Sequence, residues 1–502
     1  MDKNRWIYFF LYKLGGLFLV GSCLLIFTAC NSSKGVVGES PQKVQLVSCQ
    51  LTSPGMKTTL EAECGKLTVF EDRLSQSGRQ IDLNIAVIPA VSRNPQPDPI
   101  FLLAGGPGEA ATQSFQPIYS AFQSINQKRD IVLVDQRGTG GSHFLSCASF
   151  SSEQETESSD PQAINDNLSQ CLKELDADPK LYTTSIAMDD LDQVRSALGY
   201  DQINLYGASY GTRAALVYAR QYPEHVRTMI LDGIAPPDWA IGPSIPEDAQ
   251  RSLEMLFDRC EADTRCAQAF PDLQSEFNDI LDKVTAQPIQ VSLTHPISGE
   301  PVQFTLDRDT FVSLIHTSTY TAESAALLPL MIHTAHERGD YTQFAAMALS
   351  NYVTLSTAIS PGMRFSVLCA EDVPYYGEED TTTGYIGDFY TRTFQTICST
   401  WPRGNIPKDF RQPVTSSAPT LLLSGEADPV TPPANGELAA KTLPNSLQIV
   451  VPGQGHIVIY RGCMSKIAST FIENGSSAGL DLACIQEVVP MPFFLNPNGP
   501  PP

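Results

Sequence analysis

The feature of this 502-residue sequence that most constrains its fold is a Gly-x-Ser-x-Gly motif between two different kinds of local structure. Gly207–Gly211 (GASYG) follows the apolar run 203–206 and precedes an Ala- and Leu-rich stretch at 212–222. A continuous apolar run of this length is typical of a buried parallel strand, and the following stretch is typical of a helix. The two glycines permit a tight strand-to-helix turn, so Ser209 is expected to project above the edge of a sheet.

Other short apolar runs extend the strand pattern along the chain. They lie at 100–104, 131–134 and 229–231, and an alternation of apolar and polar residues precedes them between 46 and 91. Stretches with helical periodicity, such as 188–198, separate the runs. Strands that alternate with helices predict a mostly parallel sheet with helices on both faces. The expected fold class is therefore α/β.

A change of character after Pro236 and Pro237 predicts an inserted domain. The stretch 238–415 has few strand-like runs, and its helical segments lie at 249–260, 322–337 and 341–353. Strand-like runs return at 421–424 and 447–451. A helical block that interrupts an α/β pattern is expected to form a cap over the carboxyl-terminal edge of the sheet, where such folds bind ligands.

About 470 residues beyond the leader exceed a single compact core, so a large domain with an insertion is expected. The predicted organisation has six parts. These are a signal peptide at 1–30, a tether at 31–45, the first part of the core at 46–236, the mainly helical cap at 237–415, the second part of the core at 416–488 and a Pro-rich tail at 489–502. The tail is expected to be extended or disordered.

The histidines can be compared one by one as partners of Ser209. A serine hydroxyl is a weak nucleophile at neutral pH and needs an adjacent base. After a serine in such a turn, the acid and then the histidine follow along the chain. Of seven histidines, only His456 follows the last strand-like run, in a glycine-flanked loop. Asp428 is the predicted acid, because the proline after it fixes a turn at the end of a strand; Glu426 is the alternative.

Two loops beside Ser209 are expected to supply N–H donors. Acyl transfer needs such donors for the negative oxygen that develops on the substrate. One should be the backbone N–H of Tyr210, the residue after the serine. The other should come from the loop Ala104–Gly108, which follows a strand-like run. Pro107 has no N–H, so Gly106 is the predicted second donor.

Together these motifs resemble those of the proline iminopeptidase and tripeptidyl aminopeptidase branch of the α/β-hydrolases. The matching motifs are GGPG at 105–108, DQRGTGGS at 135–142, GASYG at 207–211, LDG at 231–233, SGEADPVT at 424–431 and GH at 455–456. The end of the chain, with Cys463 and Cys484 after the histidine, also resembles the tripeptidyl aminopeptidases. Ala104 departs from the pattern, because iminopeptidases often have histidine there. This departure argues against a strict proline iminopeptidase rather than against a hydrolase.

The resemblance implies a serine exopeptidase that releases single residues or short peptides from the amino termini of peptides, through an acyl-enzyme on Ser209. It implies no metal ion and no organic cofactor. A free amino terminus is a cation, so acidic residues of the cap are expected to bind it. Glu371 and Asp372 are the candidates and Glu261 a weaker one; for each, a solvated surface carboxylate is the alternative. Asp135 and Arg137 are interpreted as a structural ion pair near the site.

Two other functions fit parts of the same pattern. A carboxylesterase acting on small esters would use the same nucleophile, base and donors, and only the resemblance of the cap favours peptides. A surface lipoprotein that binds peptides without turnover would be expected to have lost one of the three catalytic residues. All three are present as Ser209, Asp428 and His456, which favours an enzyme.

The first thirty residues have the pattern of an export signal. Basic residues open the chain, and the run Leu14–Ala29 has no charge and is shorter than the about 20 apolar residues of a membrane span. The end of this run, with Ala29 before Cys30, resembles the signal of bacterial lipoproteins, in which the cysteine is lipidated. An ordinary cleaved signal or an uncleaved anchor is the alternative. The resemblance implies an exported lipoprotein held at a membrane by Cys30, facing the periplasm or the cell exterior.

The cysteines are consistent with export. Twelve are present, and ten remain beyond Cys23 and Cys30. Their spacing predicts five disulfides, as an oxidising compartment allows: Cys49–Cys64, Cys147–Cys171, Cys260–Cys266, Cys369–Cys398 and Cys463–Cys484. No pair has the short spacing of a zinc site or a redox dithiol.

The charge of the chain excludes some partners. It has 33 basic and 55 acidic residues, for a formal net charge of −22. Such acidity argues against nucleic acid and against anionic lipid headgroups as partners.

Overall fold

The computed structural model describes residues 43–147, 161–295, 298–377 and 384–499. The predicted signal peptide, Cys30 and most of the predicted tether lie outside these residues. Within the described ranges, no helix combines the length and the apolar character that crossing a membrane requires.

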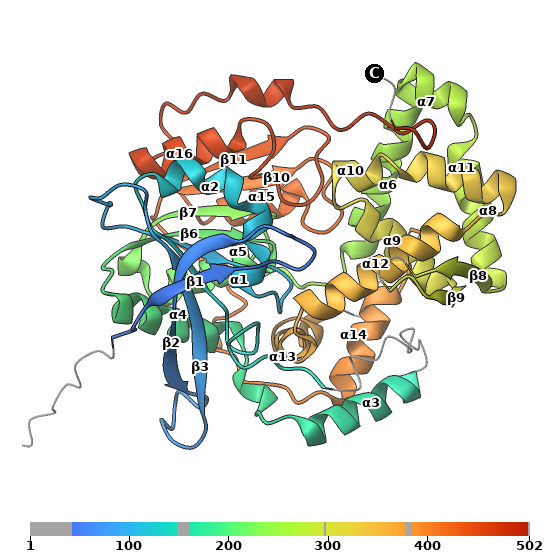
Figure 1. Ribbon diagram of the computed structural model, residues 1–502. Helices are drawn as coiled ribbons and strands as arrows, with labels where there is room; N and C mark the ends of the chain where they lie inside the picture. Colours follow the sequence, from blue (N-terminus) through green and yellow to red (C-terminus); the bar gives the residue numbers. More distant parts are fainter. Residues whose placement is uncertain (1–42, 148–160, 296–297, 378–383, 500–502) are drawn as a thin grey trace, which may run out of the picture. The chain divides into compact units, whose positions relative to one another are not determined.

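A nine-stranded sheet forms the centre of the core (Figure 1), in the order β1-β2-β3-β5-β4-β6-β7-β10-β11. The strands β1, β2 and β3 are antiparallel, β3 pairs antiparallel with β5, and the pairs from β5 to β11 are parallel. Their bounds are β1 Val47–Leu51, β2 Leu60–Phe70, β3 Gln80–Ile88, β4 Ile100–Leu103, β5 Ile131–Val134, β6 Ile203–Ala208, β7 Val226–Asp232, β10 Thr420–Gly425 and β11 Ser446–Val451.

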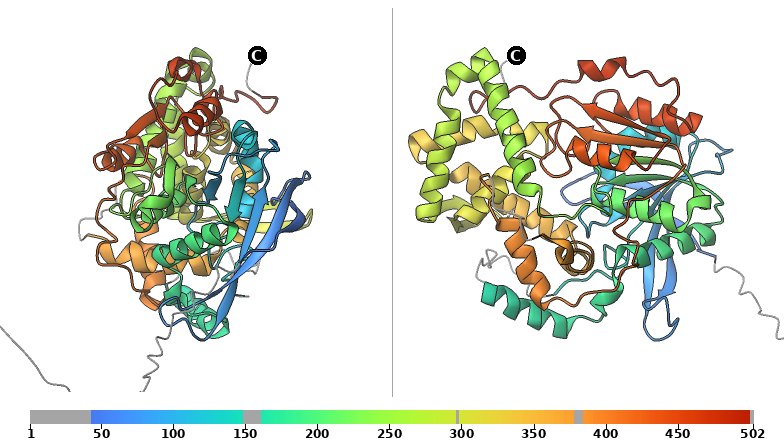
Figure 2. Two further views of the ribbon diagram at one scale, coloured as in Figure 1. Left: turned by 90° about the vertical axis from the view of Figure 1, so that its left-hand side faces the viewer. Right: turned by 180° about the vertical axis from the view of Figure 1, so that it is seen from behind.

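Helices cover both faces of this sheet (Figures 1 and 2), as the alternating pattern predicts. One face packs against α4 (Thr184–Leu198), α5 (Tyr210–Gln221) and α15 (Pro433–Ala440). The other packs against α1 (Ala111–Ser114), α2 (Tyr119–Asn126) and α16 (Met464–Asn474). The continuous apolar runs are therefore strands that are buried on both faces.

The cap lies between β7 and β10 and has a hydrophobic core of its own. Its helices are α6 Ile245–Ala262, α7 Thr264–Ala269, α8 Leu273–Ala286, α9 Arg308–Ser318, α10 Ala322–Ala325, α11 Leu328–Arg338, α12 Thr342–Ala358, α13 Pro361–Glu371 and α14 Phe389–Thr400. It also contains an antiparallel hairpin of β8 (Ile289–Thr294) and β9 (Pro301–Leu306), which the sequence did not predict. A further helix, α3 (Pro161–Glu174), belongs to the first part of the chain and contacts α14.

The Pro-rich end of the chain is packed against the cap over part of its length. Phe493 is buried within the hydrophobic core of the cap, and the guanidinium of Arg259 lies 4.0 Å from the centre of its ring. The backbone N–H of Phe494 donates to the carbonyl of Ala326 at 3.1 Å. The tail at 489–502 was predicted to be extended or disordered; in its described part these contacts hold Phe493 and Phe494 against the cap.

Five disulfides link neighbouring elements, and they are the five pairs that the cysteine spacing predicts. Cys49–Cys64 joins β1 to β2, and Cys260–Cys266 joins α6 to α7. In the same way Cys369–Cys398 joins α13 to α14. Each bridge closes a short loop, which lowers the conformational entropy of the unfolded chain and so stabilises the fold.

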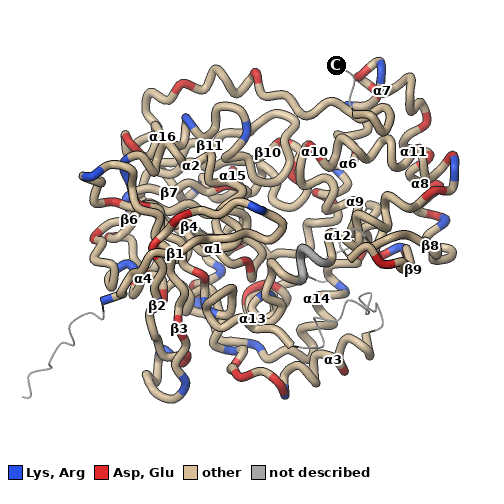
Figure 3. The backbone as a smooth tube through the Cα atoms, viewed as in Figure 1, with Lys and Arg blue, Asp and Glu red and all other residues tan. Residues whose placement is uncertain are grey.

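Charged residues are dispersed over the described part of the chain. Figure 3 shows Lys and Arg on elements of the core and of the cap, interspersed with Asp and Glu. Some of the basic residues are bound by acids; Arg129, for example, pairs with Asp98 and with Glu473 at 2.9 Å each. This distribution is in keeping with the acidic composition, which disfavours a phosphate backbone as partner.

Candidate active site

Ser209 occupies the turn between β6 and α5 with a backbone conformation that is unusual for a residue other than glycine. Its φ and ψ angles are 55° and −124°. Such a conformation is strained and persists only where the surrounding structure enforces it. The flanking glycine is required by close packing, because a Cβ on Gly211 would lie 2.1 Å from the carbonyl oxygen of Leu103. The backbone N–H of Ser209 donates to the carbonyl of Asp232 at 2.8 Å, which fixes the turn to the end of β7.

Asp428 and His456 follow two neighbouring parallel strands, β10 and β11, and their side chains meet. The distance from Nδ1 of His456 to Oδ2 of Asp428 is 2.8 Å. Oδ1 of Asp428 accepts the backbone N–H groups of Val430 and Thr431, both at 2.9 Å. The carboxylate is fully buried, so these donors hold its orientation toward the imidazole.

Thr431 is a further member of this group that the sequence analysis did not single out. Its hydroxyl donates to Oδ2 of Asp428 at 2.8 Å and lies 3.1 Å from Nδ1 of His456. It stands in the same SGEADPVT motif as Asp428, three residues later. The turn that follows Asp428 was the available signal, because the side chain of an aspartate often bonds groups two or three residues further on.

The turn that follows β7, at Asp232 and Gly233, contacts both Ser209 and His456. Asp232 binds the nucleophile turn through its carbonyl, and a Cβ on the next residue, Gly233, would lie 2.8 Å from Cε1 of His456. Gly233 has a φ of +69°, which favours glycine. The imidazole of His456 can therefore occupy its position only because Gly233 has no side chain.

The carboxylate of Asp232 anchors the loop that carries the histidine. It accepts the backbone N–H of Val458 at 2.9 Å and that of Ile459 at 2.9 Å. Burial raises the pKa of Asp232 to about 6, although these donors and His456 oppose the shift. Asp232 belongs to the LDG motif, to which the sequence analysis assigned no role.

Asp428 and His456 each stabilise the charged form of the other. Burial alone would raise the pKa of Asp428, but the nearby imidazole and the N–H donors more than offset it, so the pKa lies below 3.8. Burial likewise opposes the charged form of His456. The Asp428 carboxylate outweighs this effect and raises the pKa of His456 above 6.5. The pair can therefore hold a positive imidazolium against a stable carboxylate.

The predicted N–H donors belong to two segments that adjoin Ser209. Tyr210 begins α5 directly after the serine, and Gly106 lies in the loop after β4 with a φ of +104°. That loop is close to the nucleophile, because a Cβ on Gly105 would lie 3.3 Å from Cβ of Ser209. The arrangement can stabilise a negative oxygen on an acyl group bound at Ser209.

Two protein-family models match this chain. Residues 98–275 match the model described as alpha/beta hydrolase fold, and residues 383–484 match the model described as TAP-like protein. The first match includes Ser209, and the second includes Asp428 and His456. The chain has the α/β-hydrolase fold.

Known proteins similar to this hydrolase carry the names of peptidases. Serine protease Hip1 of Mycobacterium tuberculosis is 23% identical over 509 residues, which cover 93% of this chain and 95% of that protein. Tripeptidyl aminopeptidase of Streptomyces coelicolor is 28% identical over 192 residues, 35% of either chain. Proline iminopeptidase of Neisseria gonorrhoeae is 32% identical over 143 residues, 28% of this chain and 34% of that one. The protein is thus a serine hydrolase of the α/β-hydrolase fold with relatives named as peptidases.

Two of the acids predicted to bind substrate have structural roles in this hydrolase. Asp372 forms two hydrogen bonds of 2.9 Å with Arg213, and Glu371 accepts the N–H and the hydroxyl of Thr184 at 2.7 and 2.8 Å. Both carboxylates are fully buried and engaged. The prediction that they receive an amino terminus is therefore wrong. Glu261, the weaker candidate, is exposed at the end of α6.

The predicted ion pair between Asp135 and Arg137 is also wrong, although both residues are structural. Arg137 is fully buried and pairs with Asp190 at 2.6 Å. Asp135 instead accepts hydrogen bonds from Thr112 and Asn84, at 2.9 Å each. The two residues are near in sequence, but each is satisfied by a partner from another element.

The cap contacts the active site of the hydrolase through the end of α9. The carbonyl of Tyr320 accepts the backbone N–H of His456 at 2.7 Å, and the two rings are 5.4 Å apart between centres. His316, one turn earlier, is buried against Tyr390, and burial lowers its pKa to about 4. The ring of Tyr320 therefore packs against the catalytic imidazole, and the buried His316 packs against Tyr320 in turn.

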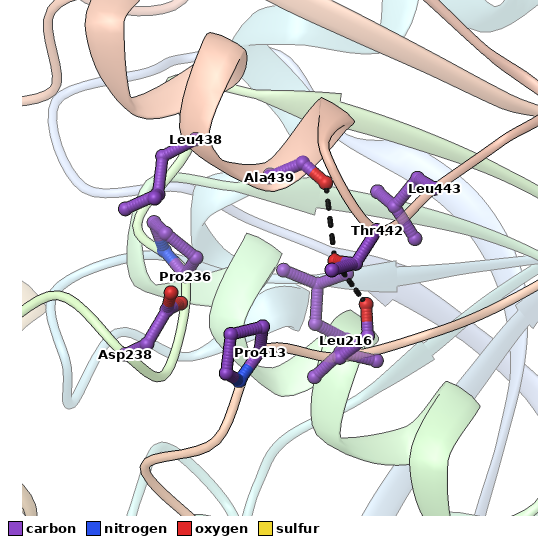
Figure 4. A pocket seen from close by; sticks show the side chains of 9 residues that line it. Leu216, Pro236, Asp238, Pro413, Leu438, Ala439, Thr442 and Leu443 are labelled. Atoms are coloured by element: carbon purple, nitrogen blue, oxygen red, sulfur yellow. Dashed lines mark hydrogen bonds between the residues drawn. The ribbon is translucent and has the colours of Figure 1, made fainter.

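Two cavities of the described chain lie elsewhere. One of about 10 Å³, enough for about one water, lies among α5, α15 and residues 413–414 (Figure 4). The other, of about 450 Å³, is lined by Phe257, Phe277 and Tyr385 of the cap, among others. Neither is lined by Ser209 or His456. The residues that would lie beside a bound substrate are therefore those in contact with Ser209 and His456.

One group of side chains in the cap could hold a metal ion. Ligand atoms of Glu276, His336 and Glu337 lie within 4.8 Å of one another on α8 and α11. His336 also pairs with Asp279 at 3.1 Å, and His333 with Glu276 at 2.8 Å. An ion-pair network between the two helices accounts for this group, and the chemistry of Ser209 does not require it.

Proposed function

We propose that this hydrolase is a serine exopeptidase that releases residues from the amino terminus of peptides. In this mechanism Nε2 of His456 takes the proton of the Ser209 hydroxyl as Oγ attacks the carbonyl carbon. The N–H groups of Gly106 and Tyr210 stabilise the resulting oxyanion. The protonated His456 then donates its proton to the leaving amine, and an acyl-enzyme remains on Ser209. A water molecule, deprotonated by His456, attacks the acyl group and restores the hydroxyl.

The single observation that carries this proposal is the bonded group of His456, Asp428 and Thr431 beside the strained turn of Ser209. An ionised, buried acid that orients the imidazole is what a serine nucleophile needs. The choice of peptides over esters is supported by the relatives named as a serine protease and as aminopeptidases, and by the TAP-like match.

The test is a comparison of substrates with the full chain, produced in an oxidising compartment. Peptide amides with a free amino terminus are expected to be hydrolysed and their acetylated forms not, with all turnover lost in Ser209→Ala. Alanine p-nitroanilide and trialanine p-nitroanilide report single-residue and tripeptide release separately. Equal turnover of free and acetylated amides would contradict an aminopeptidase.

The same panel separates the alternatives. Turnover of a short p-nitrophenyl ester without any amide hydrolysis would identify a carboxylesterase, which uses the same groups. Peptide binding without any turnover that depends on Ser209 would identify a non-catalytic binding protein.

The pH dependence of activity should reflect the raised pKa of His456. The base must be neutral to accept the serine proton, and Asp428 favours the charged form. For the neutral substrate N-acetylalanine methyl ester, kcat/KM is therefore expected to fall as the pH decreases, with an apparent pKa above 6.5. Circular dichroism at each pH controls for unfolding. An acidic limb at or below pH 6.5 would contradict this prediction.

A further inference from the structure

Glu109 places a carboxylate beside the nucleophile. It follows the GGPG loop, and its Oε2 accepts the backbone N–H of Gly105 at 3.2 Å. A Cβ on Gly105 would lie 3.3 Å from Oε2 of Glu109 and 3.3 Å from Cβ of Ser209. The Glu109 carboxylate and Ser209 therefore both lie next to Gly105. Glu109 lies just beyond the GGPG motif, so no sequence motif indicated a role for it.

The backbone of Glu109 is held where the core meets the cap. Glu109 forms an isolated β-bridge with Ile359, and the carbonyl of Gly108 accepts the N–H of Ser360 at 2.9 Å. Ser360 is the N-cap of α13. A Cβ on Gly108 would lie 2.7 Å from the carbonyl oxygen of Ser360, so the two segments are in close contact. The position of this side chain is thus fixed by both parts of the fold.

Glu109 forms no direct ion pair with another of the described residues. The side chain is partly buried, and its Oε1 accepts no hydrogen bond from the described chain. Burial raises the pKa of Glu109, opposed by the Gly105 N–H, by His456 and by Arg364. None of the described ion pairs within 4.0 Å joins Arg364 to Glu109. A carboxylate in this position would be stabilised by a cationic group of a ligand.

We propose that Glu109 binds the α-ammonium group of the substrate, and hence that the enzyme releases a single amino-terminal residue. This inference rests on the proposed function and names its substrate class. In an aminoacyl substrate, the ammonium is two covalent bonds from the carbonyl carbon that Ser209 attacks. In a tripeptidyl substrate the ammonium lies two residues further along the chain, which places it up to about 7 Å further from the attacked carbonyl carbon. A carboxylate adjacent to Ser209 matches the first geometry.

The test compares Glu109→Gln with the unmodified full chain on alanine methyl ester and N-acetylalanine methyl ester. Glutamine keeps the size of the side chain and an oxygen for the Gly105 N–H, but it has no charge. For the free ester, kcat/KM is expected to fall about 10- to 100-fold, as for the loss of a charge-assisted hydrogen bond. For the acetylated ester it should change less than about 3-fold. Glu300→Gln, on an exposed residue before β9, is the matched control.

Each other outcome overturns the inference. An equal loss on both esters would mean that Glu109 shapes the donor loop, and no loss on either would mean that it binds no ammonium. Rapid release of tripeptides from trialanine p-nitroanilide, unaffected by Glu109→Gln, would place the amino terminus elsewhere while leaving the exopeptidase proposal standing. The methyl esters test the role of Glu109, and the peptide amides test the exopeptidase. A failure to hydrolyse amides would therefore contradict the exopeptidase proposal without being mistaken for a result on Glu109.

Discussion

Replacement of His456 by alanine is expected to lower kcat about 10⁶-fold, because it removes the base that takes the proton of Ser209. Asp428→Asn should lower it about 10⁴-fold, since the amide cannot stabilise the imidazolium and favours the wrong tautomer. Thr431→Val removes one donor to Asp428 and should cost about 10-fold. Turnover of alanine p-nitroanilide, which has the free amino terminus that the proposed exopeptidase requires, measures all three effects.

Glu426→Gln is the matched control for this series. Glu426 is exposed, lies two residues before Asp428 and accepts the backbone N–H of Gly453 at 2.8 Å. Its replacement should leave kcat within about 3-fold of the starting value, as for the loss of at most one exposed hydrogen bond. If Glu426→Gln lost far more activity than Asp428→Asn, the acid of the site would be Glu426, and the orientation of His456 by Asp428 would have no catalytic consequence. Thermal unfolding of each variant excludes loss of structure as the cause.

The parts of the site that could be predicted from sequence are those fixed by local geometry. Ser209 lies in a turn whose glycines, strand and helix are all within a few residues, and each has its own sequence signal. Asp428 follows strand β10 and His456 follows strand β11, and both strands are visible as apolar runs. The parallel sheet then brings the ends of these strands together without any further specific contact.

The parts that could not be predicted depend on partners that are distant in sequence. The roles of Glu371 and Asp372 are decided by Arg213, more than 150 residues earlier on α5. Nothing in the cap sequence indicates that an arginine of the core would engage them. The β8–β9 hairpin was missed for a related reason, because only alternate residues of its strands are buried against the cap and no long apolar run marks it.

Loss of Arg213 should lower the free energy of unfolding more than replacement of any of the active-site residues. Arg213 is fully buried, one helical turn after Ser209. Its two terminal nitrogens bind Asp372, and one of them also donates to the carbonyl of Trp239 at 2.9 Å. Asp372 further accepts the N–H of Ile241 at 2.8 Å. The guanidinium thus ties helix α5 of the core to the start of the cap, at Trp239, and to the end of α13, at Asp372.

Arg213→Ala is therefore expected to lower the free energy of unfolding by about 3–5 kcal/mol, because it leaves the Asp372 carboxylate buried without a counter-ion. Burial raises the pKa of Glu371 to about 7 while Arg213 opposes the shift, so loss of Arg213 should leave Glu371 more fully protonated. Urea denaturation measures the effect. The control is Arg392→Ala, whose partners Asp309 and Asp388 lie at the surface, with an expected cost of about 0–1 kcal/mol.

The double variant Arg213→Met/Asp372→Leu separates the two possible sources of this loss. If the cost of Arg213→Ala comes from an uncompensated buried charge, removing both charges together should restore part of the stability, so that the double variant unfolds at a higher urea concentration than Arg213→Ala. If the cost comes from the lost contacts between core and cap, the double variant should be at least as unstable as Arg213→Ala. A loss no larger than that of Arg392→Ala would mean that the buried ion pair does not hold the cap to the core.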